Sequence, residues 1–305
     1  VTAAPTPAEE MLVQGHLLVS DSAPAVEHVD QAADLERRFG GLRRLYGDAG
    51  YARLRVARVA VVGLGGVGSW AAEALARSGV ARLTLIDLDH IAESNINRQI
   101  HALDSTVGQA KVLAMQERIA LINPQCEVVC VEAFVDATNW PALAALPAGA
   151  GVSVIDACDQ VKAKTAMAAW AMHNNININI NFISVGAAGG KRHAHKVDID
   201  DLSLVTHDPL LAQLRYRLRK EQGAARTGKI GVACVFSREA VLQPSALSQI
   251  KSGSPADGAD EVACTARNDT QSDGSLNCHG YGSVVSVTAT FGQCAAGWVL
   301  GKIAE

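Results

Sequence analysis

The sequence VVGLGGVGSW, residues 61–70, decides how the fold is organised. It carries the G-x-G-x-x-G pattern of a nucleotide-binding turn with one additional glycine, at Gly63, Gly65, Gly66 and Gly68. An apolar run at 58–62 precedes this loop, and an alanine-rich segment at 69–79 follows it. This order predicts a strand, a tight turn and a helix, in which glycines let backbone amides approach a phosphate. The loop predicts a nucleotide site but does not decide between NAD and ATP.

The alternation of apolar and helical segments continues beyond the loop. Strands are expected at 83–87, 127–135, 152–159 and 178–190, and helices at 108–124 and 162–173. Parallel strands need crossover connections, which helices usually supply. We therefore expect an α/β fold with a doubly wound, mainly parallel, Rossmann-like sheet and a C-terminal α+β extension.

Composition favours a globular protein with reduced thiols. Of its 305 residues, 49% are hydrophobic and 19% are charged, and the net charge is −4. The seven cysteines are widely spread and form no C-x-x-C pair, so neither a disulfide framework nor a zinc ribbon is expected. Because no basic start with an apolar run opens the sequence, no signal peptide is expected, and we predict a cytoplasmic protein.

Residues after the loop favour nucleotidyl transfer over hydride transfer. Asp87 ends the second strand, where a carboxylate can accept hydrogen bonds from a ribose. Asn95 and Arg98 follow within a short segment, and Lys111 opens the next helix. Nucleotidyl transfer builds charge on the α-phosphate and on the leaving pyrophosphate, and cations stabilise that charge. A hydride-transferring enzyme has no evident use for such a cluster.

A carboxylate pair follows the strand at 152–159. Mg²⁺ bridging phosphates typically takes one or two protein carboxylates and keeps several waters. We choose Asp159 as the metal ligand, with Asp156 as a supporting group or helix cap.

Several motifs in order resemble a known superfamily. GLGGVGSWAAEAL, LIDLD, SNINRQ, VGQAK and DACD, spread over about 37–190, resemble those of the ubiquitin-activating-enzyme-like adenylating enzymes, which adenylate a carboxylate with ATP. Within that superfamily, RRFGGLRRLYG, NRQIHAL, VGAAGG and GKIGVACVFSRE most resemble the family of bacterial tRNA threonylcarbamoyladenosine dehydratases.

The resemblance implies an activity and its participants. ATP would adenylate the carboxylate of the threonylcarbamoyl group on an adenosine next to the tRNA anticodon, and a carbamoyl nitrogen would then close a ring with net loss of water. The four glycines, Asp87 and Asn95 would bind ATP, Arg98 and Lys111 would act on its phosphates, and Asp159 would hold Mg²⁺ and complete the catalytic set. A homodimer is implied, with tRNA carrying threonylcarbamoyladenosine as substrate and sulfur-transfer proteins of a cysteine desulfurase system as further partners.

The chain is expected to consist of three regions. Residues 1–34, rich in Ala, Pro, Asp and Glu, are expected to form a flexible extension. Residues 35–190 would be the ATP-binding adenylation domain. Residues 191–305 would contribute to substrate binding and the dimer, with a mobile loop at 243–275.

Other functions remain open at this point. The enzyme could adenylate the C-terminus of a small sulfur-carrier protein, although the zinc-binding C-x-x-C pairs of familiar members are missing. An NAD-dependent oxidoreductase would leave Arg98, Lys111 and the two aspartates unexplained. A catalytically silent partner-binding module would not need the full set of ATP residues.

The sequence leaves more than one role open for each of four further features. Any of Arg38, Arg43 and Arg44 could reach the ATP of a partner subunit, and Cys234 is expected to be a buried strand thiol rather than a nucleophile. The basic amphipathic helix at 208–223 could meet tRNA phosphates or solvent. The uncharged stretch 274–301 favours a buried core or subunit-interface helix over membrane contact.

Overall fold

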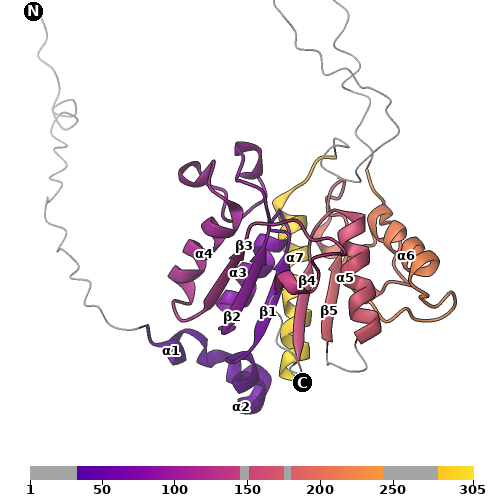
Figure 1. Ribbon diagram of the computed structural model, residues 1–305. Coiled ribbons are helices and arrows are strands. Elements are labelled where there is room, and N and C mark those ends of the chain that lie inside the picture. The colour runs from indigo at the N-terminus through magenta and orange to yellow at the C-terminus, as the bar shows by residue number, and fades with distance from the viewer. Residues whose placement is uncertain (1–32, 145–150, 175–179, 243–280) are drawn as a thin grey trace, which may run out of the picture. The chain divides into compact units, whose positions relative to one another are not determined.

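In the described part of the chain, seven strands form one sheet in the order β3-β2-β1-β4-β5-β7-β6. The first five of these are labelled in Figure 1. They are β1 (Arg58–Val62), β2 (Arg82–Ile86), β3 (Glu127–Val131), β4 (Val152–Asp156), β5 (Ile180–Val185), β6 (Val197–Asp201) and β7 (Ala233–Ser237). Every neighbouring pair is parallel except β6 and β7, which are antiparallel. The predicted doubly wound, mainly parallel sheet is confirmed, and its direction of winding reverses between β1 and β4. Ligands of such sheets bind at the carboxyl ends of the strands beside this reversal.

This computed structural model describes residues 33–144, 151–174, 180–242 and 281–305. Most of the expected N-terminal extension and the whole expected loop at 243–275 lie outside these ranges. From Asp34 onward the chain belongs to one compact unit.

Helices cover both faces of the sheet. They are α1 (Leu35–Phe39), α2 (Arg43–Leu54), α3 (Gly68–Arg77), α4 (Lys111–Ile122), α5 (Val161–Asn174), α6 (Pro209–Glu221) and α7 (Val285–Ala304). Helices α3, α4 and α7 pack in the core on one face, and α5 and α6 pack in the core on the other. Alternate residues of β1 divide between these cores, since Val59 and Val61 join the first while Ala60 and Val62 join the second.

Helix α7 contains residues 285–301 of the uncharged stretch 274–301, and it is a core helix, whereas residues 274–280 lie outside the described ranges. Val287, Phe291 and Val299 are completely buried in the core that α3 also contributes to. At Gly292 a Cβ atom would lie 2.4 Å from the Val67 carbonyl oxygen, so the two helices meet backbone against backbone. The expectation of a buried helix is thus confirmed. Among the described residues, no helix combines the length and apolarity that crossing a membrane requires.

Three expected strands end earlier in the structure, and one observed strand was not expected. The strands expected at 127–135 and 178–190 end at Val131 and Val185. The strand expected at 152–159 ends at Asp156, so Asp159 lies in the connection to α5. The sequence also gave no expectation for β6, whose residues VDIDD place aspartates, poor strand formers, along the strand. It lies at the sheet edge, antiparallel to β7, and so extends the same sheet with C-terminal residues.

Candidate nucleotide and substrate site

The glycine loop joins β1 to α3 by a turn that only small residues permit. Gly63 has φ +85°, and a Cβ there would lie 2.9 Å from the Ala157 carbonyl oxygen. A Cβ at Gly68 would lie 1.7 Å from the Gly63 carbonyl oxygen. Gly65 differs, because a Cβ there would meet no atom within 4 Å. Gly63 and Gly68 therefore form the turn, whereas Gly65 faces open space where a ligand can approach.

Helix α3 begins at this loop without a capping side chain. Val67 is the N-cap residue, and no side chain among the described residues caps the first turn. Uncapped amides at a helix N-terminus, together with the helix dipole, favour an anion. The predicted strand, turn and helix thus produce a phosphate-binding geometry.

Asp87 ties the glycine loop to the end of β2. Its Oδ2 accepts a hydrogen bond from the Leu64 amide at 2.5 Å, and its Oδ1 accepts one from the Asp89 amide at 2.9 Å. Burial raises the pKa of Asp87, while the charge of Lys111 and these amides act in the opposite direction. The Asp87 carboxylate therefore holds the glycine loop in place. The sequence predicted only a contact of this carboxylate with ribose.

Lys111 is the first residue of α4, as predicted, and its side chain is 7% exposed. Its Nζ lies 2.7 Å from Asp89 Oδ2 and 3.9 Å from Asp87 Oδ1. The structure thus brings Lys111 and Asp87 together from the ends of α4 and β2. Asp89, which sequence reasoning passed over, is the closest counter-ion of this lysine.

Arg98 lies against the glycine loop. A Cβ at Gly66 would meet the Arg98 Cγ at 3.1 Å and Cδ at 3.2 Å, so the missing side chain makes room for the arginine stem. The guanidinium donates from Nη1 to the Ser94 carbonyl oxygen at 2.8 Å and to Asn97 Oδ1 at 2.9 Å. In the described part of the chain no carboxylate pairs with Arg98, and burial lowers its pKa. A held cation without a counter-ion can receive a phosphate.

Asn95 has a contact that the sequence did not suggest. Its Oδ1 accepts a hydrogen bond from the Ala92 amide at 3.1 Å and closes the turn that carries Arg98. This oxygen is therefore engaged within the protein, and its predicted role toward a nucleotide stays a prediction.

The two aspartates after β4 differ in their surroundings. Asp156 is completely buried, and its Oδ2 accepts from Lys164 Nζ at 3.0 Å and from Ser184 Oγ at 2.6 Å. It is an internal ion-pair residue, so the suggestion that it caps a helix is wrong. Asp159 is half-buried, and no hydrogen bond or ion pair within the described residues occupies its carboxylate.

The position and free carboxylate of Asp159 suit a magnesium ion that is held largely by phosphates and water. The connection carrying Asp159 touches the glycine loop, because the Ala157 carbonyl oxygen and the Cys158 amide surround Gly63. No group of three or more His, Cys, Asp or Glu side chains suited to a metal occurs among the described residues. A single carboxylate fits Mg²⁺ in a nucleotide site, since this ion keeps several water ligands.

Two buried polar side chains next to Arg98 were not predicted to matter. Gln99 Oε1 and both ring nitrogens of His101 are buried without a hydrogen-bond partner in the described residues. Burial, reinforced by the charges of Lys111 and Arg118, lowers the pKa of His101 from 6.5 to about 4. His101 is therefore neutral at pH 7. The signal in the sequence is the polar pair inside NRQIH, but its burial depends on tertiary packing.

The three N-terminal arginines make no hydrogen bond or ion pair with the described residues of the candidate nucleotide site. Arg38 donates to the Ile122 carbonyl oxygen at 2.7 Å, and Arg43 pairs with Glu36 and Asp48 at 3.0 Å each. Arg44 is exposed, and no ion pair or hydrogen bond engages its guanidinium in the described ranges.

Cys234 is a structural residue of the sheet, whereas the role of the basic helix toward tRNA stays a prediction. Cys234 is completely buried in β7, and burial raises the pKa of its thiol well above the usual value, as expected of an inert thiol. Helix α6 has the predicted position, with Asp208 as its N-cap. Arg217 pairs with Glu221 on this helix, while Tyr216 is 63% exposed.

The chain is similar to known proteins over most of its length. The model of the ThiF family matches residues 38–303. The tRNA threonylcarbamoyladenosine dehydratase of Escherichia coli (strain K12) is 41% identical over 271 residues, which cover 88% of this chain and 93% of that relative. The solved structure of the E. coli tRNA N6-threonylcarbamoyladenosine dehydratase in complex with ATP matches with a TM-score of 0.72 and 38% identity, over 89% of this chain and 96% of that one. The same enzyme in complex with AMP matches with a TM-score of 0.71 and 38% identity, over 89% of this chain and 96% of that one.

Proposed function

We propose that this chain, which belongs to the ThiF family, is an ATP-dependent cyclising enzyme that dehydrates the threonylcarbamoyl group of N6-threonylcarbamoyladenosine in tRNA. The observation that carries the proposal is the pairing of Gly66 with Arg98, which sets a cation without a counter-ion beside an uncapped helix N-terminus. The extent and identity of the match to the E. coli dehydratase support the substrate.

The chemistry follows from the poor reactivity of a carboxylate. A carboxylate oxygen of the threonyl group attacks the α-phosphorus of ATP, an O–P bond forms, and pyrophosphate leaves. A carbamoyl nitrogen then attacks the activated carbonyl carbon, a C–N bond forms, and AMP leaves as the nitrogen loses its proton. No protein nucleophile is required, which agrees with the inert environment of Cys234.

The residues of this chain bind, orient and stabilise charge. The amides of the glycine loop, with Gly65 facing open space, meet the phosphates, while Asp87 and Asn95 border the nucleotide. Arg98 and Lys111 neutralise negative charge that develops on the α-phosphate and the pyrophosphate. Lys111 must then exchange part of its contact with Asp89 for phosphate, which is favourable because Asp89 is 59% exposed and readily solvated.

Asp159 would hold Mg²⁺, as its unoccupied carboxylate beside the glycine loop allows. Held there, the ion would supply positive charge that stabilises the negative charge of the phosphates.

Further parts of the proposal rest on the family resemblance. They are a homodimer, a cytoplasmic location, sulfur-transfer partners, an adenylation domain at 35–190, and a substrate and dimer role for 191–305. The seven-stranded sheet crosses this boundary, so the two regions share one core.

The proposed reaction is tested by measuring its two products, AMP and the dehydrated nucleoside, in one assay. The protein is incubated with ATP, Mg²⁺ and tRNA carrying threonylcarbamoyladenosine, and AMP release and nucleoside mass are measured. We expect one AMP per nucleoside and a mass loss of one water. Unmodified tRNA is the control for the substrate, and Arg98→Ala in a normally folded protein is the control for the site.

Two outcomes would overturn the proposal. AMP released only with a small carrier protein would show that the enzyme adenylates the C-terminal carboxylate of that protein and not the threonylcarbamoyl group. Full turnover by the Arg98→Ala variant would remove this arginine from the mechanism.

A further inference from the structure

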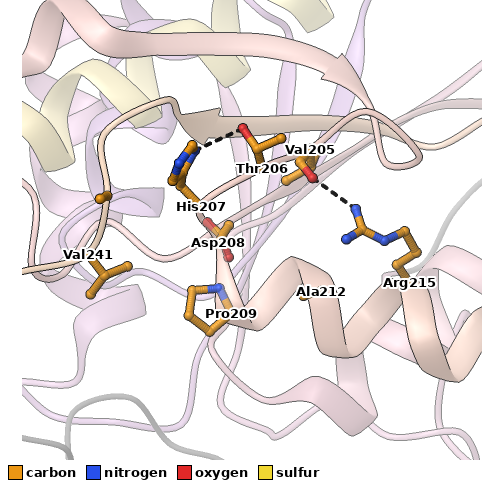
Figure 2. A pocket seen from close by; sticks show the side chains of 9 residues that line it. Val205, Thr206, His207, Asp208, Pro209, Ala212, Arg215 and Val241 are labelled. Atoms are coloured by element: carbon orange, nitrogen blue, oxygen red, sulfur yellow. Dashed lines mark hydrogen bonds between the residues drawn. The ribbon is translucent and has the colours of Figure 1, made fainter.

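A hollow of about 280 Å³ lies at the start of α6, outside the nucleotide site (Figure 2). Its wall consists of the 205–209 connection, the first turns of α6 and the residues that follow β7. Pro209, Ala212 and Val241 provide apolar surface, and His207 and Arg215 provide polar groups. A hollow near the lower limit of ligand pockets suits one small, partly apolar group.

The hollow lies on the same edge of the sheet as the nucleotide site. Asp208 Oδ2 accepts a hydrogen bond from the Ala187 amide at 2.8 Å, just beyond the end of β5. Strand β5 pairs in parallel with β4, and the connection after β4 carries Asp159. The Asp208 side of the hollow, where α6 begins, therefore lies at the edge that also carries the candidate nucleotide site.

Buried charges hold the backbone of His207 in an unfavourable conformation. His207 has φ +56°, and no other residue except glycine has a positive φ among those described. Its carbonyl oxygen accepts a hydrogen bond from Lys191 Nζ at 2.8 Å, and Lys191 is 2% exposed. On the other side, Asp208 is 5% exposed and accepts from the Leu211 amide at 2.9 Å as well as from Ala187.

The packing around Asp208 leaves no freedom to relax this backbone. A Cβ at Gly186 would lie 2.1 Å from Asp208 Oδ2, so a glycine is required where β5 ends. Strain that the surroundings enforce in this way is concentrated at functional positions. Here it presents an exposed imidazole at the hollow, and among the described residues the imidazole hydrogen-bonds only the neighbouring Thr206 hydroxyl, at 3.1 Å (Figure 2).

Arg215 adds a positive charge without a counter-ion. Its Nη1 donates to the carbonyl oxygens of Leu202 and Val205 at 2.9 Å each, which fixes the guanidinium beside the hollow. Figure 2 shows the contact with Val205. No carboxylate pairs with Arg215 in the part of the chain that is described. The neighbouring Asp208 carboxylate is engaged with two backbone amides.

We propose that this hollow is a subsite for one unpaired nucleotide of the tRNA substrate, next to the adenosine whose side group reacts. Single-stranded RNA is recognised by rings and apolar side chains that contact a base, and by arginine that contacts phosphate. Pro209, Val241 and the His207 ring offer the first kind of contact, and Arg215 offers the second. The inference rests on the proposed function and adds a specificity site to it.

The test introduces a carboxylate inside the hollow and, as a matched control, one just outside it. Ala212 and Gln213 are both exposed on α6, but only Ala212 lines the hollow. Ala212→Glu and Gln213→Glu therefore alter the charge of the same helix equally. His207→Asn is a second probe, since asparagine tolerates a positive φ but has no ring.

Two measurements are made on each full-length variant. The first is the affinity for an anticodon stem-loop RNA carrying threonylcarbamoyladenosine, measured by fluorescence anisotropy without ATP. The second is the steady-state KM and kcat for the modified tRNA, with ATP affinity measured separately. We expect Ala212→Glu to weaken RNA binding about tenfold and to raise KM about tenfold. His207→Asn should change both quantities about threefold, and Gln213→Glu should change both by less than about twofold. ATP affinity should be unchanged in all three.

The outcomes separate this inference from the proposed function. Equal RNA affinity of the Ala212→Glu and Gln213→Glu variants would overturn the subsite. A loss of ATP affinity in Ala212→Glu as large as its loss of RNA affinity would overturn it as well. If wild type binds the RNA and Ala212→Glu weakens that binding, but AMP and dehydrated nucleoside never appear, the subsite stands and the proposed reaction fails.

Discussion

Lys164 Nζ lies 3.0 Å from Asp156 Oδ2, and both side chains are completely buried at the carboxyl ends of β4 and β5. Lys164 also donates to the Val185 carbonyl oxygen at 2.7 Å, so one ammonium group holds two adjacent strands. Burial lowers the pKa of Lys164, but the Asp156 carboxylate and other neighbouring groups together raise it above its usual value. The pair fixes the start of the connection that carries Asp159.

Removing the lysine should destabilise the fold strongly. Lys164→Ala leaves the Asp156 carboxylate buried without its cation, and we expect the free energy of unfolding to fall by about 3–5 kcal/mol. Urea denaturation measures this change. Lys162→Ala, an exposed lysine on the same helix, is the control and should stay within about 0.5 kcal/mol of wild type. Equal effects of the two substitutions would contradict the role of the ion pair.

Gly65 offers a test of nucleotide approach that avoids the fold. Because a Cβ at this position meets no atom within 4 Å, Gly65→Ala should change the free energy of unfolding by less than about 1 kcal/mol. The same methyl group would occupy the space where phosphate approaches the loop, so ATP affinity should fall about tenfold. Calorimetric titration with ATP measures the affinity. Unchanged ATP affinity in the Gly65→Ala variant would mean that phosphate does not reach this part of the loop.

His101 predicts a loss of stability in mild acid. Its pKa in the folded state is about 4, below the 6.5 of the unfolded chain, so the unfolded state binds more protons between these values. The contribution of neutral His101 is complete above pH 6.5 and is lost as pH falls from 6.5 toward 4. The full loss amounts to at most about 3 kcal/mol.

Denaturation at pH 7.5 and at pH 5 measures this dependence. His101→Leu should lose less stability than wild type between the two pH values, whereas His173→Gln, which changes an exposed histidine, should lose as much as wild type does. If His101→Leu showed the wild-type difference, another group would account for the acid sensitivity.

Arg44 is the N-terminal arginine best placed to act on a partner subunit, because Arg38 and Arg43 are engaged within their own chain. If it completes the site of the other protomer, the Arg44→Ala and Lys111→Ala variants should each be inactive alone. Mixing them under subunit exchange restores one complete site in each mixed dimer, which gives about a quarter of wild-type AMP release. Arg43→Ala in place of Arg44→Ala is the control and should be active alone. Absence of recovery in the mixture would place Arg44 in its own protomer's site, and an active Arg44→Ala variant would place it outside the mechanism.

Gly292 and Gly297 form a matched pair on α7. A Cβ at Gly292 would press on the backbone of α3, and we expect Gly292→Ala to lower the free energy of unfolding by about 1–3 kcal/mol. Gly297 has no atom within 4 Å of such a Cβ, so Gly297→Ala should stabilise the helix by about 0.5–1 kcal/mol. Thermal or urea unfolding distinguishes the signs. Stabilisation by both substitutions would show that α7 does not require close contact with α3.

Local patterns in the sequence were sufficient for the first half of the sheet. The glycine loop, the strand before it and the helix after it are contiguous, and the Arg98 and Lys111 motifs follow in order, so their fold and grouping could be predicted. The position of β7 between β5 and β6 could not, because it depends on pairing between distant segments. The burial of His101 and the pairing of Lys164 with Asp156 were missed for the same reason, since a charged or polar residue shows its environment only after packing.

The contact of α7 with α3 has a consequence for biosynthesis. The glycine loop emerges from the ribosome long before Val285, yet Thr288 of α7 flanks Gly66, and the Ser283 carbonyl oxygen just before α7 accepts a hydrogen bond from Asn97 at 3.2 Å. We therefore expect a nascent chain that ends before residue 281 to bind ATP poorly, which truncated chains stalled on ribosomes would reveal. Nucleotide competence would then require that α7 has been synthesised, so nascent chains without it would neither sequester ATP nor release AMP during translation.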